Sequence, residues 1–170
     1  GDIDARSGDS LNVILGKVKA RASGVYLFSR GTLTNRATID ASGGDDLAID
    51  RGVDGMGQPG TRIWLQSMDQ VVNSGQLIGH GGSGEYAGGS GAAIWLAGVV
   101  VDNSAPLDAA GGDADPTRAG ASGGHGGAVQ LDSPDDYMSV FNTNAGDVSG
   151  GDGETLGGPG YDLEGSLCLS

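Results

Sequence analysis

Four stretches of the chain share one pattern: an asparagine, an aliphatic residue four positions later, and then a pair of glycines. The copies begin at Asn35, Asn73, Asn103 and Asn144, and the fourth is two residues shorter before its glycine pair. The segment from Ile3 to Ala5 matches the end of a further copy. Repeats of 20–50 residues are typical of solenoids, in which similar units stack on one another. The repeat therefore limits the chain to folds built by stacking.

A second block precedes each asparagine and alternates an aliphatic residue, a variable residue and another aliphatic residue. Its last position recurs at steps of 31 to 38 residues along the chain. Three copies also carry an aliphatic residue two positions before the asparagine, at Leu33, Val71 and Val101. The block occupies residues 25–27, 63–65, 94–96, 129–131 and 167–169.

Alternation with a period of two predicts β-strands, whose successive side chains point to opposite faces. Each unit then contains three short strands, and no segment shows the period of a capped helix. Glycine accounts for 35 of the 170 residues, a content that would otherwise favour disorder. A stack of units needs few large apolar residues per unit, because each unit buries its aliphatics against its neighbours. We therefore expect residues 1–170 to form one all-β domain, a right-handed parallel β-solenoid of about four coils of ~35 residues with glycine-rich lateral insertions.

The repeated asparagine fits a tight turn between the second and third strands, since Asn tolerates left-handed backbone angles and bonds nearby backbone groups. In register, Asn35, Asn73, Asn103 and Asn144 would also form a ladder of side-chain amide bonds. A turn residue without a ladder is the alternative.

The glycine-rich insertions all follow the third strand, at 43–60, 81–91, 111–127 and 150–160, so they leave from one edge. Two alternatives remain open for them. They are flexible exposed loops, or they pack on one another as extended segments with glycine at the crowded contacts.

The middle residues of the first-strand blocks point outward if their aliphatic neighbours point inward. With coils about 4.8 Å apart, Tyr26, Trp64 and Trp95 would form an aromatic column on one outer face. Such a column either pairs across strands to stabilise the sheet, or offers ring faces to sugars.

Paired acidic residues occur in the loops, and calcium takes six to eight oxygen ligands. The candidates for a calcium site are Asp113, Asp115, Asp152 and Glu154. The segment 150–157 begins like a calcium-binding nonapeptide but lacks its required Asp and its aliphatic position. Solvated turn residues are the alternative, and calcium is the only cofactor we consider.

Several functional classes are disfavoured. The net charge of −13 opposes binding to nucleic acid, and the apolar runs are too short to span a membrane. The single Cys168 excludes an intramolecular disulfide. Because no nucleophile motif or paired acid–base set recurs, we expect no enzyme and no catalytic residue.

The phrases "TNRATIDASGG", "VNSGQLIGHGG" and "VDNSAPLDAAGG" resemble repeats of filamentous-haemagglutinin-type adhesins and autotransporter passenger domains. The resemblance implies a right-handed parallel β-helix exported to the cell surface. The long glycine-rich insertions and the unequal repeat lengths depart from that family.

We therefore expect an extracellular or cell-surface structural and adhesive element. Neither end shows a polar or helical cap, which predicts a fragment of a longer array or a protomer that stacks end to end into a filament. Its partners would be copies of itself or neighbouring repeats. The alternatives are a glycan- or surface-binding module that uses the aromatic column, and a calcium-stabilised stalk.

Overall fold

A computed structural model describes residues 3–4, 10–11, 24–47, 55–133, 140–144, 146–158 and 161–164. For residues 3–4, 10–11, 47 and 161–164 the description covers the backbone only. Every regular element in these ranges is a β-strand, and every strand pairing is parallel.

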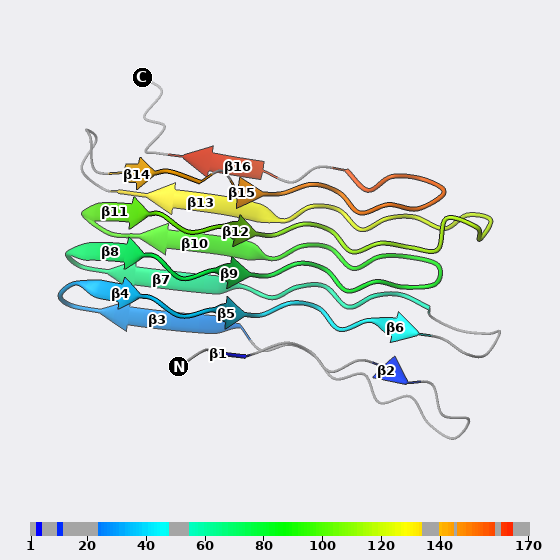
Figure 1. Cartoon of the computed structure of the whole chain (residues 1–170), viewed down its shortest axis with the longest axis horizontal. Helices are drawn as coiled ribbons and strands as arrows, with labels where there is room; N and C mark the ends of the chain where they lie inside the picture. Colours follow the sequence, from blue (N-terminus) through cyan, green and yellow to red (C-terminus); the bar gives the residue numbers. More distant parts are fainter. Residues whose placement is uncertain are drawn as a thin grey trace.

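Three parallel sheets run side by side through the molecule, and each unit of the sequence contributes one strand to each (Figure 1). The first sheet contains β3 (Val25–Ser29), β7 (Ile63–Ser67), β10 (Ala93–Ala97), β13 (Ala128–Asp132) and β16 (Tyr161–Glu164). The second contains β4 (Leu33–Asn35), β8 (Gln70–Asn73), β11 (Val100–Asn103) and β14 (Val140–Asn142). The third contains β1 (Ile3–Asp4), β5 (Ile39–Asp40), β9 (Leu77–Ile78), β12 (Leu107–Asp108) and β15 (Gly146–Asp147). A small fourth sheet pairs β2 (Ser10–Leu11) with β6 (Asp46–Leu47).

The strands stack in register, so equivalent residues of successive units lie next to one another. Ile63 pairs with Ile94, and Ile94 pairs with Val129. The pairing of Ile3 with Ile39 confirms that the segment at residues 3–4 ends a preceding unit. A parallel, solenoid-like stack of sheets is therefore confirmed as the architecture.

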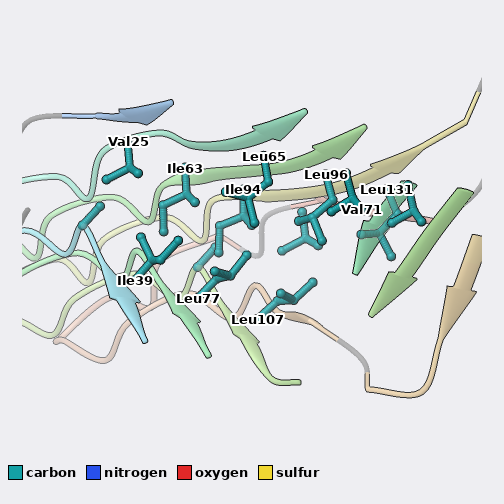
Figure 2. Close-up of a cluster of buried hydrophobic side chains, with 14 residues drawn as sticks. Val25, Ile39, Ile63, Leu65, Val71, Leu77, Ile94, Leu96, Leu107 and Leu131 are labelled. Carbon is teal, nitrogen blue, oxygen red and sulfur yellow. The ribbon is translucent and has the colours of Figure 1, made fainter. Parts of the chain in front are cut away.

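The hydrophobic core lies between the three sheets, where aliphatic side chains from all of them meet (Figure 2). Leu65, Val71 and Leu77 come from the three strands of one unit, and each is fully buried. Their outward neighbours are half-buried or exposed, as strand alternation requires. Each unit thus completes its core against the units before and after it.

The fourth unit corrects the sequence alignment. Asn103 pairs with Asn142 rather than Asn144, and Leu107 pairs with Gly146 rather than Val148. With this shift of two residues the fourth copy has the same spacing to its glycine pair as the third. Gly146 then occupies an inward position that is aliphatic in the other copies. The pattern search missed it because a glycine carries no hydrophobic signal.

The predicted C-terminal block at 167–169 is also corrected. β13 pairs with Tyr161–Glu164, in a register shifted by five residues toward the N-terminus from the aligned block. Residues 167–169, with Cys168, lie outside the described residues. In the observed register Gln130 pairs with Leu163, so Leu163 takes the position that the alignment gave to Cys168.

The glycine-rich insertions pack into an ordered glycine layer beside the sheets. We use this name for the segments that run out from the third sheet, at 41–47, 79–84, 109–114 and 148–153, and those that return to the first, at 55–61, 87–92, 121–127 and 154–158. Both sets extend on the same side of the sheets (Figure 1). Of the two alternatives left open by the sequence, the packed arrangement is the one observed.

Backbone hydrogen bonds connect outgoing and returning segments in a continuous zigzag. Gly82 N donates to Gln58 O, Gly89 N to Gly82 O, and Gly112 N to Gly89 O, each at 2.8 Å. The series continues through Gly124, Gly151 and Gly157 at 2.8–3.0 Å. Among the described glycines only Gly120 has a left-handed φ, of 79°. Close approach of backbones, rather than unusual torsion angles, therefore explains most of the glycine in this layer.

Candidate functional site

The outward residues of the first sheet form the aromatic column that the alternation predicted. Tyr26 pairs with Trp64 and Trp64 with Trp95, at the same position of β3, β7 and β10. The fourth residue of this row is Gln130 on β13. The row lies on the face opposite the core, beside the returning segments of the glycine layer.

The ring geometry divides the column into a stacked pair and a tilted neighbour. The Trp64 and Trp95 rings are 4.4 Å apart between centroids, with an interplanar angle of 16°. Their facing surfaces therefore cover each other. Tyr26 lies 5.9 Å from Trp64 at 56°, and its side chain is 58% exposed. Among the three rings of the column, Tyr26 alone combines high exposure with a ring that is not stacked in parallel on a neighbour.

Both indole Nε1–H groups of the stacked pair are buried and have no hydrogen-bond acceptor among the described residues. An unpaired buried donor costs about 1–3 kcal/mol. Ring stacking and area burial offset this cost, since aromatic pairs contribute about 0.5–1.5 kcal/mol beyond the area that they bury. The stacked tryptophans therefore serve to pack the outer face of the first sheet.

The asparagines form a ladder of side-chain amides along the inner edge of the second sheet. Asn35 Nδ2 donates to Asn73 Oδ1 at 2.8 Å, and Asn73 Nδ2 donates to Asn103 Oδ1 at 2.7 Å. Asn103 Nδ2 donates to Asn142 Oδ1 at 2.8 Å. Asn73 and Asn103 are fully buried.

Asn144 lies outside this ladder. Its Nδ2 donates to Ser104 O at 2.6 Å, and its backbone N–H donates to Asn142 Oδ1. The register explains the correction, because Asn142 is the residue that pairs with Asn103. The segment 142–144 contains two asparagines, and the sequence pattern selected the second.

Three of the four acidic candidates for a metal site accept hydrogen bonds from nearby protein groups. Asp113 Oδ1 accepts a hydrogen bond from Asp152 N at 2.8 Å, and a Glu154 carboxylate oxygen accepts one from Gly120 N. Asp115 Oδ1 accepts from the backbone N–H and the hydroxyl of Thr117 at 2.9 and 2.7 Å. Within the described ranges no three His, Cys, Asp or Glu side chains gather where they could hold a metal ion.

Arg118 holds the tip of one insertion, a role that the sequence analysis did not assign. Its guanidinium forms an ion pair with Glu85 and lies 5.7 Å from the Tyr86 ring centroid. It also approaches Asp115, with Nε 3.9 Å from Oδ2. The hydrogen bonds from Thr117, and secondarily Arg118, lower the pKa of Asp115 below its ordinary value. These contacts link tips of neighbouring units, which lie far apart in the sequence.

A shallow hollow adjoins Tyr26, where returning segments enter the first sheet. It has a volume of about 460 Å³ and is lined by the Tyr26 ring, Thr61, Arg62 and three glycines, Gly24, Gly60 and Gly91. The sequence analysis missed it because residues from three units contribute to it, and only the register brings them together.

Comparison with protein-family models, with curated protein sequences and with solved structures returned no match. In the described part of the chain, no helix has the length and apolar character needed to cross a membrane.

Proposed function

We propose that the chain is a structural and adhesive element of an extracellular surface, built as a right-handed parallel β-solenoid of about four coils. The proposal includes a relationship to filamentous-haemagglutinin-type and autotransporter adhesins. It is based on the resemblance of the repeat sequences to those of these families. It also includes association with further copies or further repeats along the stacking axis.

One observation carries this proposal: three kinds of contact repeat in the same direction from unit to unit. They are the aliphatic core, the asparagine ladder and the backbone zigzag of the glycine layer. Each is strengthened by adding another unit in register, so the arrangement suits a body that is extended by repetition.

The stacked tryptophans support a structural function rather than a sugar platform along the whole column. Two of the three aromatic rings cover each other's faces, so those faces are not open to a ligand. The calcium-stabilised stalk receives less support, since the carboxylates of Asp113, Asp115 and Glu154 already accept hydrogen bonds from protein donors.

Surface location and adhesion are tested together. Antibodies against the purified chain should label intact cells of the source organism as strongly as lysed ones. Beads coated with the chain should adhere to a host-cell layer or to an abiotic surface more strongly than beads coated with the Gly82→Ala variant, whose glycine layer is disrupted. The Gly31→Ala variant is the matched control and should adhere like the native chain. Labelling confined to lysed cells, or equal adhesion by all three proteins, would contradict the proposal.

Stacking is tested by sedimentation at increasing protein concentration. Association along the solenoid axis predicts a rising sedimentation coefficient and elongated particles in electron microscopy. A folded chain that stays monomeric across this range would remove the end-to-end part of the proposal.

A further inference from the structure

The shallow hollow beside Tyr26 is open to solvent and brings an aromatic ring and a cationic side chain together. Its volume of about 460 Å³ lies within the range of small-molecule clefts, about 300–1,000 Å³. Gly24, Gly60 and Gly91 contribute no side chains to it, so backbone forms much of its floor. The lining residues come from the first strands of three successive units and the segments that lead into them.

Tyr26 supplies an aromatic wall. A Cβ added to Gly24 would lie 2.9 Å from Tyr26 Cε2, so the ring rests directly against the Gly24 backbone. Because its plane is tilted from Trp64 by 56°, Tyr26 does not continue the parallel stack. An exposed aromatic face of this kind packs against the C–H face of a pyranose ring.

Arg62 supplies a cation next to that wall. It is exposed, and within the described residues its side chain has no ion pair and no hydrogen bond. Its neighbours in the adjoining strands, Gly24 and Ala93, are uncharged and small. By contrast, Arg118 is paired with two carboxylates. A guanidinium presents a planar fork of donors that matches a carboxylate.

We propose that this hollow binds a saccharide ring that carries a carboxylate. The ring would pack on Tyr26, and the carboxylate would bind the Arg62 guanidinium. The Thr61 hydroxyl donates to Ala41 O at 3.4 Å, so it would accept a hydrogen bond from a sugar hydroxyl. We expect the ligand to be a single acidic sugar unit rather than a dense polyanion. The chain carries a net charge of −13, so it would repel a polyanion. This binding activity goes beyond the structural function proposed above and does not depend on it.

The test uses NMR titration of the full chain with trigalacturonate and with its fully methyl-esterified form, which keeps the rings and removes the charge. An alginate trisaccharide and sialyllactose extend the range of acidic sugars. We expect shifts of the amide signals of Gly24, Gly60 and Gly91 on addition of an acidic probe. Binding of the ester should be at least about tenfold weaker than that of trigalacturonate, since hydrogen bonds to charged groups contribute about 1.5–3 kcal/mol.

Two variants separate the contribution of the Arg62 charge to binding from that of the Tyr26 ring. Arg62→Gln should weaken binding of the acidic probe about tenfold or more and leave the ester unchanged. Tyr26→Ala should weaken both. Arg36→Gln, which changes an exposed arginine next to β4, is the matched control and should bind like the native chain.

The proposal is overturned if none of the acidic probes shifts these amide signals. It is also overturned if the native chain binds ester and acid equally, or if Arg62→Gln binds like Arg36→Gln. Because titration in solution requires neither adhesion nor stacking, failure here leaves the proposed structural function intact, and failure of adhesion leaves this site intact.

Discussion

Asn73 donates its side-chain N–H to the side-chain oxygen of Asn103 across neighbouring strands, at 2.7 Å, with both residues fully buried. Asn73 also accepts from Asn35, so it is an internal link of the ladder. Its side-chain amide therefore forms hydrogen bonds with the asparagines of both the preceding and the following unit.

Replacing Asn73 with alanine should destabilise the chain by about 2–4 kcal/mol, because it leaves the buried Asn103 Oδ1 without its donor and removes the acceptor of Asn35. Urea denaturation followed by circular dichroism would measure the loss. Asn144→Ala is the matched control. It removes a more exposed bond to Ser104 O and should cost about 1 kcal/mol or less. Equal losses in the two variants would show that the ladder does not contribute to stability.

Gly82→Ala tests whether the glycine layer is as densely packed as its contacts indicate. An added Cβ would lie 2.1 Å from Gly44 O, a distance that requires the backbone to move. We expect a loss of more than about 3 kcal/mol in the free energy of unfolding, together with loss of amide protection at Gly89 and Gly112 in hydrogen exchange. Gly31→Ala meets no atom within 4 Å and should stay within about 0.5 kcal/mol of the native chain. A native melting temperature for Gly82→Ala would mean that the layer is loose.

Gly146→Ala tests the corrected register of the fourth unit. The equivalent residues Ile39, Leu77 and Leu107 are aliphatic. The repeat alone would therefore predict that a larger side chain at Gly146 does not destabilise the fold. The structure predicts the opposite, because the new Cβ would lie 2.9 Å from Val129 Cγ2. We expect a loss of about 1–3 kcal/mol.

A double-mutant cycle with Val129→Ala makes the Gly146 prediction specific. Val129→Ala opens space at the contact, so the double variant should lose less stability than the sum of the two single losses. Additive losses would show that Gly146 does not face Val129.

The repeat predicted most of the strands because two independent sequence signals agree in each of the early units. These signals are the alternating aliphatic block and the asparagine that follows it. Ile63 and Leu65 alternate, and Asn73 follows at the distance that places it in the second sheet. In the fourth unit these signals separate: Gly146 replaces the aliphatic residue, and Asn142 and Asn144 compete for the same position. A pattern based on side-chain type then selects the wrong asparagine, whereas hydrogen-bond register selects the right one.

The candidate site was harder to predict, because strand alternation places a residue on a face but does not orient its ring. The sequence placed Trp64 and Trp95 in one column, yet either stacked or open rings would satisfy that pattern. The hollow beside Tyr26 and the contacts of Arg118 depend on which loop residues meet across units. Loops of unequal length carry no periodic signal for such contacts.

Acidification should loosen the insertion tip around Asp115. Hydrogen bonds from Thr117, followed by the charge of Arg118, lower the pKa of Asp115 in the folded chain. A carboxyl whose folded pKa is depressed stabilises the fold above its unfolded pKa, and this contribution is lost as pH falls through the folded pKa. NMR titration from pH 6 downward should therefore show the Thr117 amide signal moving at a pH below about 3.9, the ordinary value for Asp.

Asp115→Asn is the control for this titration. Asn keeps an acceptor oxygen for Thr117 but does not ionise, so the amide shift of Thr117 should lose its dependence on pH in this range. A titration midpoint of Asp115 at or above the ordinary value, or an unchanged profile in Asp115→Asn, would contradict the assignment.

Trp95→Ala and Trp95→Phe distinguish packing in the tryptophan pair from a need for the indole N–H. Alanine removes the 4.4 Å stack on Trp64 and should cost about 2–3 kcal/mol in urea denaturation, below the loss for a fully buried Trp because Trp95 is partly exposed. Phenylalanine keeps a ring over Trp64 and removes a buried donor that has no acceptor among the described residues, so it should cost less than about 1 kcal/mol. Gln130→Ala changes the next residue of the same row, which is exposed, and should have an effect within about 0.5 kcal/mol. If Trp95→Phe destabilised the chain as much as Trp95→Ala, the indole N–H would have a partner that stabilises the fold, and the pair could not be explained by packing alone.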